Sequence, residues 1–208
     1  MSASLAQSQA RCDAESMSSG TISSAFERHK RTLDLTASVD VFGRAESAAE
    51  LLLATVRSNN TVFICGNGGS AADSQHFAAE WTCKYKQARR PLAAIALTTD
   101  TSALTAIGND FGFEFVFSRQ VDALAKKGDV LIVLTTSGTS ANILKAAEIA
   151  RAKGVRVIAL TGSKGLAGTT AEDIVIRVPS DETARVQEMH ALLYHAWCEY
   201  IDGGILQS

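Results

Sequence analysis

The chain alternates short, continuously apolar runs with longer segments in which apolar residues recur every three or four positions. Apolar runs of roughly four to eight residues are typical of strands that are buried on both faces, and the longer spacing is typical of helices. The predicted strands are Thr61–Cys65, Ala93–Leu97, Val130–Leu134, Val155–Leu160 and Asp173–Val178. The helices predicted between and after them are Ala71–Lys86, Ser102–Gly108, Phe115–Ala125, Ala141–Lys153 and Glu182–Asp202.

This alternation of strands and helices predicts an α/β fold in which a doubly wound parallel sheet is covered by helices on both faces. Helical spacing at Thr21–Val39 and Val41–Ser58 adds N-terminal helices, as a helical hairpin or as one broken helix. Residues 1–20 are small and polar, so we expect a disordered leader there. A chain of 208 residues suits one sizeable core, and we expect a single domain over residues 21–208.

Composition narrows the classes of function. A formal net charge of −2 and an isoelectric point near 6.1 give no global attraction to nucleic acid or to an anionic membrane. The basic run Lys84–Arg90 is predicted to be a solvated helix end and loop. No apolar run reaches the roughly 18 residues that a bilayer span needs, and the N-terminus lacks the apolar segment of a secretory signal. The four cysteines lack paired spacing, which predicts free thiols in a cytoplasmic protein: Cys12, Cys65, Cys83 and Cys198.

Two loops rich in glycine and hydroxyl residues follow the first and third predicted strands, at the sheet edge where such folds bind ligands. Backbone N–H groups at a helix start, together with hydroxyl groups, bind phosphate and other small anions. The first loop, GNGGS, is equally well explained as a tight turn, and it completes neither a dinucleotide-binding nor a Walker A motif. The second loop, TTSGTS, holds more hydroxyls than one helix cap needs and favours an anion. The candidate ligand-binding residues are Asn67, Gly68, Gly69, Ser70, Thr135, Thr136, Ser137 and Ser140.

Titratable side chains stand on two of the predicted helices. His76 and Glu80 are four residues apart and so lie on one helix face, which suits metal binding or acid–base chemistry but is more often found in a solvated surface pair. The last helix carries Gln187, His190 and His195. At about 100° per residue, both histidines lie within reach of the face that holds Gln187, so the periodicity does not choose between them.

Five segments in this order resemble the SIS (sugar isomerase) domain family, and most closely its phosphoheptose isomerases. They are CGNGGSAADSQHFAAE at 65–80, GNDFGF at 108–113, TSGTSAN at 136–142, VIALTG at 157–162 and RVQEMHALLYH at 185–195. The resemblance as a whole covers about residues 21 to 202, and the fixed order of the segments makes coincidence a poor explanation. The resemblance implies a SIS-type, flavodoxin-like sandwich and a homotetramer with active sites between its subunits.

The activity implied by the resemblance is conversion of sedoheptulose 7-phosphate to D-glycero-D-manno-heptose 7-phosphate through an enediol(ate). Glu80 and His195 match the acid–base pair, which leaves His190 in a packing role. The substrate set gains Asp100 and Gln187 in addition to the two loops. One zinc ion per subunit is expected, with ligands at His76, Glu80, Gln187 and His195.

The chain departs from the family pattern in places that affect substrate preference. Thr135 and Thr139 stand where Ser and Asn are more usual, and Lys84 stands where some members have Arg, beside Cys83 where Gly is common. Two alternatives stay open: an isomerase of another sugar phosphate, and a non-catalytic SIS adaptor that associates with the replication initiator. The adaptor branch lacks equivalents of the acid–base pair, which this chain retains.

Overall fold

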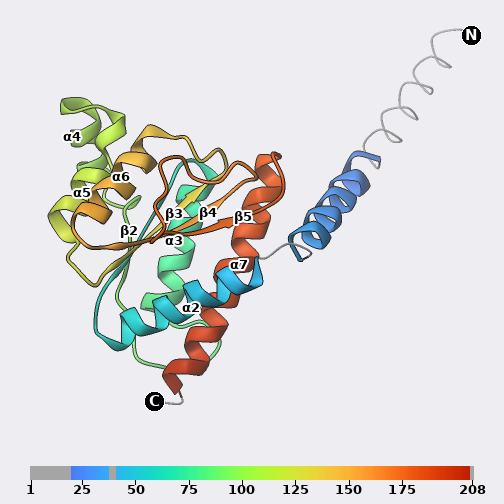
Figure 1. The fold of residues 1–208 in the computed structure, drawn as a ribbon, viewed down its shortest axis with the longest axis horizontal. Coiled ribbons are helices and arrows are strands. Elements are labelled where there is room, and N and C mark those ends of the chain that lie inside the picture. Colours follow the sequence, from blue (N-terminus) through green and yellow to red (C-terminus); the bar gives the residue numbers. More distant parts are fainter. Residues whose placement is uncertain (1–19, 38–40, 207–208) are drawn as a thin grey trace, which may run out of the picture.

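The computed structural model describes residues 20–37 and 41–206. Five parallel strands form one sheet in the order β2-β1-β3-β4-β5, which is the flavodoxin-like order (Figure 1). The predicted α/β class and all five predicted strands are confirmed, each boundary within one or two residues. The observed strands are β1 Val62–Gly66, β2 Ala94–Ala96, β3 Val130–Thr135, β4 Arg156–Thr161 and β5 Ile174–Arg177.

Helices cover both faces of this sheet. The helices of the described residues are one over residues 20–37, which extends away from the sheet, α2 Phe42–Arg57, α3 Gly69–Thr82, α4 Thr101–Asp110, the short 3₁₀ helix η1 Phe113–Phe115, α5 Ser118–Leu124, α6 Ala141–Ala152 and α7 Thr183–Leu206. Helices α2, α3 and α7 lie on one face, and α4, α5 and α6 lie on the other (Figure 1). None of the described helices combines the length and the apolar composition needed to cross a bilayer.

Each strand supplies side chains to two separate cores, because successive side chains point to opposite faces of a sheet. Ile64 of β1 packs with Phe77, Trp81 and Trp197 beneath α2, α3 and α7. Its neighbour Phe63 packs on the other side, with residues of α5 and α6. Every residue of β1 and β3 is buried, which explains why these strands read as continuous apolar runs.

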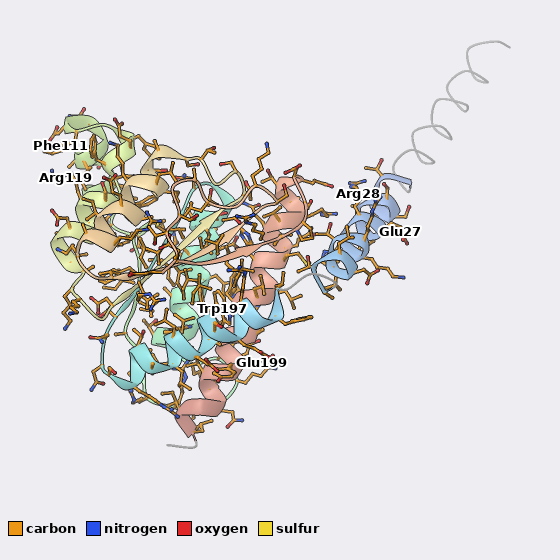
Figure 2. All side chains as sticks on the ribbon, in the orientation of Figure 1. Glu27, Arg28, Phe111, Arg119, Trp197 and Glu199 are labelled. Carbon is orange, nitrogen blue, oxygen red and sulfur yellow. The ribbon has the colours of Figure 1, made fainter. Side chains whose placement is uncertain are left out.

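The helix over residues 20–37 extends from the sandwich and contacts the first turns of α7 (Figures 1 and 2). Arg28 pairs with Glu182 at 3.1 Å, and His29 Nδ1 lies 2.7 Å from a carboxylate oxygen of Glu188. Residues 38–40, which connect this helix to α2, lie outside the described residues, and so do residues 1–19 of the predicted leader. The hairpin therefore stays a prediction, and only its two helical segments are described.

The basic run after α3 is not uniformly solvated, contrary to our prediction. Helix α3 ends at Thr82 instead of Lys86, because the Arg89 guanidinium donates to the carbonyl groups of Glu80 and Trp81. Arg89 also pairs with Asp202 at 2.6 Å, and the two side chains are 1% and 5% exposed. A buried ion pair is tolerated only when further hydrogen bonds complete it, and the backbone N–H of Lys86 supplies one to Asp202.

Two further expectations change in detail. The predicted helix Phe115–Ala125 is divided into η1 and α5, with a short break between them. Cys65, Cys83 and Cys198 are free thiols, as expected, and Cys12 lies outside the described residues.

Candidate active site

The first glycine loop connects β1 to α3 and begins one wall of a pocket. Gly68 precedes the first residue of α3 and has a φ of +56°, a backbone conformation that favours glycine. Helix α3 has no side-chain cap, and the N–H groups of Ser70 and Ala71 donate to the carbonyl oxygens of Asn67 and Gly68, which closes the loop tightly onto the helix. Ser70 is 3% exposed, and its Oγ accepts a hydrogen bond from Nε2 of Gln187 at 3.2 Å.

The second loop connects β3 to α6 and forms the opposite wall. Thr135 Oγ1 accepts from the backbone N–H of Gly138 at 3.1 Å, so this hydroxyl closes the loop on itself. Ser137 is exposed, and its Oγ accepts from the N–H of Thr139. Ser140 stands at the start of α6, but its side chain makes no capping bond. The hydroxyl excess noted in the sequence thus divides into hydroxyls that hold the loop together, on Thr135 and Ser137, and that of Ser140, which caps no helix.

A pair of asparagine side chains joins the two loops. Asn67 donates to Oδ1 of Asn142 at 3.0 Å, and Asn142 donates back to Oδ1 of Asn67 at 2.8 Å. The strands that lead into the loops, β1 and β3, are neighbours in the sheet, with Gly66 opposite Leu134. Asn142 is a residue that the sequence reasoning missed, because its partner is distant in the chain.

The loops enclose a pocket of about 270 Å³ at the carboxyl ends of β1 and β3. Sequence order reverses between these two strands, and this is where doubly wound sheets bind ligands. Helices α3, α6 and α7 all begin at the pocket, and their N-terminal ends carry positive partial charge. The lining residues are Asn67, Gly68, Gly69, Ser70, Leu134, Thr135, Thr136, Ser137, Ser140, Thr183 and Gln187.

Asp100 is the one predicted substrate residue that does not line this pocket. It caps the start of α4, where its Oδ1 accepts from the N–H of Ala103 at 2.9 Å. Conversely, Thr183 lines the pocket and was missed by the sequence reasoning. Its signal was a hydroxyl at the start of the last predicted helix, the same signal that identified Ser140.

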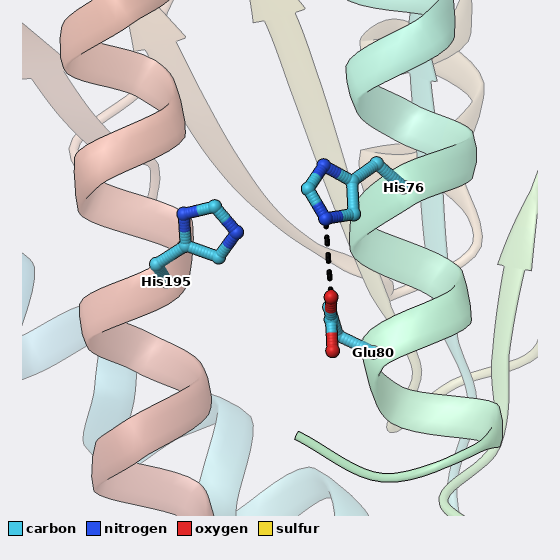
Figure 3. A group of neighbouring side chains, drawn as sticks. All are labelled: His76, Glu80 and His195. Atoms are coloured by element: carbon cyan, nitrogen blue, oxygen red, sulfur yellow. Dashed lines mark hydrogen bonds and ion pairs between the residues drawn. The ribbon is translucent and has the colours of Figure 1, made fainter. Parts of the chain in front are cut away.

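Glu80 and His195, 115 residues apart in sequence, meet within one chain, and His76 joins them (Figure 3). One ligand atom from each of the three residues lies within 4.8 Å of the other two. His76 Nε2 is 3.1 Å from Glu80 Oε1, and the two imidazole rings are 5.1 Å apart between centroids. Helix α3 supplies His76 and Glu80 and helix α7 supplies His195, so the packing of these two helices creates the group.

Aromatic and acidic neighbours surround the three residues. Tyr85 stacks on His195 at 5.8 Å between centroids, and the Tyr194 hydroxyl lies 3.2 Å from Nδ1 of His76. Burial raises the pKa of Asp73, although His76, a hydrogen bond from Tyr194 and His195 oppose the shift. Burial and the charge of Asp73 raise the pKa of Tyr194 well above its usual range, so this phenol stays protonated. His76, Glu80 and His195 thus have both a neutral phenol, Tyr194, and an acidic side chain, Asp73, as neighbours.

Two imidazoles and one carboxylate fit a metal ion. Two histidines and a glutamate are a familiar donor set for catalytic zinc, which keeps a further coordination position open. A metal site needs ligand atoms that lie close together, and the ligand atoms of these three residues do so, which the spacing in the sequence alone could not decide. Gln187, the fourth predicted ligand, is instead bonded to Ser70 at the pocket. It precedes His195 by two helical turns, about 12 Å along α7, and its role as a ligand stays a prediction.

His190 is the histidine that the periodicity alone left as an equal candidate. The structure buries it completely, and neither ring nitrogen makes a hydrogen bond of good geometry to a described residue. Burial lowers the pKa of His190 to about 4, and the Thr161 backbone opposes this shift only in part. A neutral, buried imidazole of this kind serves packing, in agreement with the choice of His195.

Comparison with known proteins agrees with this geometry. A family model for the SIS domain matches residues 36–162. The phosphoheptose isomerase of Campylobacter concisus is 49% identical over 181 residues, which cover 87% of this chain and 95% of that protein. The phosphoheptose isomerase of Neisseria gonorrhoeae is 53% identical over 164 residues, which cover 77% and 83%.

Solved structures give the same result. The structure of the Neisseria gonorrhoeae phosphoheptose isomerase matches with a TM-score of 0.84 at 46% identity, and that from Francisella tularensis with a TM-score of 0.86 at 40% identity. Each match covers 89% of this chain and 98% of the other chain. The chain therefore belongs to the SIS domain family, and within that family to the phosphoheptose isomerases.

Proposed function

We propose that the protein is an aldose–ketose isomerase that converts sedoheptulose 7-phosphate to D-glycero-D-manno-heptose 7-phosphate. The observation that carries this proposal is the meeting of Glu80 and His195 beside an anion pocket in one chain. Relatives that share 49–53% identity with this chain are named phosphoheptose isomerases. The same meeting disfavours the non-catalytic adaptor, which has no use for a converged acid–base pair.

The phosphate of the substrate is assigned to the pocket. Hydroxyl groups of Ser137 and Ser140 and the N-terminal ends of three helices line it, and all of them favour an anion. No lysine or arginine lines the pocket, so hydrogen bonds and helix ends supply the recognition. A site of this kind binds a phosphate monoester without a fixed salt bridge.

The reaction moves a carbonyl group from C2 to C1. Glu80, as the base, removes a proton from C1, and the electron pair of that C–H bond forms the double bond of the enediolate. His195 exchanges a proton with the neighbouring oxygen, and proton return to C2 together with loss of the O1 proton gives the aldose. The two groups are close enough to act on adjacent atoms of one substrate.

We assign one zinc ion per subunit to His76, Glu80 and His195, with Gln187 as the predicted fourth ligand. When bound, zinc supplies positive charge next to the oxygens on which negative charge develops. Elemental analysis of protein purified without a chelator is expected to give close to one zinc per chain, and chelation is expected to abolish activity that added zinc restores. A chelated enzyme with full activity would remove the metal from the proposal.

A homotetramer is the proposed assembly. Exposed apolar side chains gather around a groove of about 360 Å³ between the helix over residues 20–37, α2 and α7. Leu33, Phe42 and Leu192 are 37%, 60% and 50% exposed there, and Phe26 lies further along the first helix at 73%. Exposed apolar surface of this extent is typical of subunit contacts. Light scattering coupled to size-exclusion chromatography is expected to give four chains per particle, and a monomer would contradict the assembly.

A cytoplasmic location stays part of the proposal, supported by the free thiols.

The activity is tested by incubating the protein with a panel of five-, six- and seven-carbon ketose phosphates in deuterated water. NMR is expected to show aldose–ketose interconversion of sedoheptulose 7-phosphate with solvent deuterium at C1 or C2. Faster turnover of a shorter sugar phosphate would move the proposal to another isomerase, and no turnover of any sugar would overturn it.

A further inference from the structure

The hydroxyl group of Tyr194 lies between two side chains of the neighbouring helix. On one side it is 3.2 Å from Nδ1 of His76, and on the other lies the carboxylate of Asp73, close enough for the phenol and the carboxylate to shift each other's pKa. Asp73 and His76 are three residues apart on α3 and so face the same side of that helix. The three groups form a continuous chain from a carboxylate, through a phenol, to an imidazole.

Packing fixes the position of this hydroxyl. The Tyr194 residue is 1% exposed, and its ring stacks on Phe77 at 5.0 Å with an interplanar angle of 20°. Its edge-to-face contact with the His76 ring, at 5.6 Å and 78°, holds the phenol against the imidazole that it bonds. A side chain held by rings on two sides loses little further freedom when its hydroxyl donates or accepts.

The direction of the hydrogen bonds follows from what each group can donate. A carboxylate only accepts, so the Tyr194 O–H donates to Asp73. The phenol oxygen then accepts, and the donor available to it is an N–H at Nδ1 of His76. A neutral imidazole carries one N–H, so Nε2 keeps its lone pair. That lone pair faces the side of the group where Glu80 Oε1 lies, 3.1 Å away (Figure 3).

We propose that Asp73 and Tyr194 are positioning residues that hold His76 as its Nδ1–H tautomer, with Nε2 directed at a metal ion shared with Glu80 and His195. The proposal deepens the assignment of the metal site and rests on it. The 3.1 Å between Nε2 and Oε1, a hydrogen bond when Nε2 carries the proton, is also a separation that two ligands of one cation can have. Carboxylate groups commonly orient metal-binding histidines, and here a tyrosine transmits that effect.

The opposite arrangement is less stable. If the Tyr194 hydroxyl donated to Nδ1, the Asp73 carboxylate would lose its hydrogen bond from the phenol. Loss of its hydrogen-bond partner destabilises a partly buried acceptor. A metal ion at Nε2 and a carboxylate beyond the phenol therefore favour the same direction of every bond in the chain.

Zinc affinity of the full-length protein tests the proposal without substrate. The variants are Tyr194→Phe, which keeps the stacked ring and removes the hydroxyl, and Asp73→Asn, which keeps the shape and removes the charge. Affinity is measured by competition with a chromophoric chelator. We expect Tyr194→Phe to weaken zinc binding about 10- to 100-fold, the usual effect of losing such a partner, and Asp73→Asn to weaken it less, because its amide oxygen still accepts.

The matched control is Tyr200→Phe, which removes a phenol from the same helix at a position that is 43% exposed. This control is expected to bind zinc as tightly as the unaltered protein. The double variant of Tyr194→Phe with Asp73→Asn is expected to be no weaker than Tyr194→Phe alone, because the carboxylate acts only through the phenol. Strictly additive losses would contradict a chain of this kind.

The tautomer itself has a spectroscopic signature. The protein has four histidines, so ¹⁵N-labelled imidazoles can be assigned individually. In the zinc-loaded protein, His76 is expected to show a protonated Nδ1 whose proton exchanges slowly, and Tyr194→Phe is expected to lose this protection. Circular dichroism confirms that each variant is folded before it is compared.

Zinc affinity unchanged in Tyr194→Phe, or a protonated Nε2 on His76 in the zinc-loaded protein, would overturn the inference. Absence of zinc binding by the unaltered protein would overturn it as well. Failure of the proposed isomerase activity is seen separately, in the sugar phosphate panel, and leaves the comparison of zinc affinities intact.

Discussion

The anion pocket and the group of His76, Glu80 and His195 are built in different ways. The pocket is lined largely by glycines and short hydroxyl side chains of two loops, each a few residues long. The acid–base group consists of three long side chains supplied by two helices, α3 and α7. The first region takes its geometry from local turns, and the second takes its geometry from helix packing.

Because of this difference, the pocket should tolerate side-chain substitutions that the acid–base group does not. A loop whose N–H groups point at an anion depends on backbone conformation, and many side chains suit it. A converging group depends on the positions of α3 and α7, which the buried contacts of Phe77, Tyr194 and Trp197 hold together. We therefore expect side-chain substitutions in the acid–base group to damage catalysis, and backbone changes in the loops to damage binding.

Replacement of Glu80 by Gln is expected to have the largest effect. It removes the proposed base, which is also a proposed zinc ligand, while keeping the size of the side chain, and loss of a general base typically lowers turnover by about 10²–10⁴-fold. KM is expected to change by less than about threefold, because the phosphate still occupies the pocket. Steady-state kinetics with sedoheptulose 7-phosphate measures both constants.

Glu148→Gln serves as the control, since Glu148 is an exposed residue of α6. It is expected to retain the turnover number of the unaltered protein. If Glu80→Gln kept most of its activity, the acid–base role would pass from Glu80 to another group, and the contrast between the two regions would be lost.

The two regions also differ in how far the sequence predicts them. The loops follow apolar strands directly, so both their composition and their place at one edge of the sheet were predictable. Every predicted substrate-binding residue except Asp100 lines the pocket, whereas the carboxylate of Asp100 caps α4. The preference of Asp for helix starts gave an equally good local reason for that residue.

Long-range contacts explain what the sequence did not reveal. Spacing left His190 and His195 equivalent, because only the tilt of α7 against α3 decides which imidazole meets Glu80. The buried pair of Arg89 with Asp202 is hidden in the same way, because the partners are 113 residues apart. Such contacts depend on how the helices pack. The periodicity of a sequence predicts which face of a helix is buried, but not which distant residue that face meets.

His190 connects the two regions, because it lies on α7 between Gln187 of the pocket and His195 of the acid–base group. Its pKa is lowered to about 4 by burial, whereas an unfolded chain titrates with a pKa near 6.5. The unfolded state binds the proton first as the pH falls. The free energy of unfolding is therefore expected to fall between pH 6.5 and about 4, by up to about 3 kcal/mol.

Urea unfolding at several pH values checks this dependence, and His190→Leu isolates it. An apolar side chain leaves no ring nitrogen to protonate, so the variant is expected to lose less stability on acidification than the unaltered protein. Equal acid sensitivity of the two proteins would show that other groups dominate. Pocket binding and turnover are expected to decline together at low pH, since both regions share α7.

Replacement of Gly138 by Ala is expected to disturb the pocket through the backbone alone. Gly138 has a φ of +70°, and an added Cβ would lie 1.7 Å from the carbonyl oxygen of Gly165. A forced shift of the loop on top of the strained φ is expected to cost about 2–3 kcal/mol of stability and to raise KM more than kcat is lowered. Thermal unfolding and steady-state kinetics measure the two effects.

Gly168→Ala is the matched control, because Gly168 has a similar φ of +64° but no atom within 4 Å of an added Cβ. It is expected to lose about 1 kcal/mol of stability from backbone strain and to keep its KM. Equal KM values for Gly138→Ala and Gly168→Ala would show that the loop conformation does not control binding.

Replacement of Ser137 by Ala is expected to have the smallest effect and to sharpen the contrast most. The Ser137 hydroxyl lines the pocket, and the loss of one hydrogen bond to a charged phosphate costs about 1.5 kcal/mol, which raises KM about tenfold. Turnover is expected to stay within about twofold, because the hydroxyl is remote from the carbon atoms that exchange protons. Thr139→Val removes a hydroxyl from the same loop outside the pocket lining, and its KM is expected to change less. A loss of turnover in Ser137→Ala as large as in Glu80→Gln would place the hydroxyl among the reacting groups and join the two regions into one.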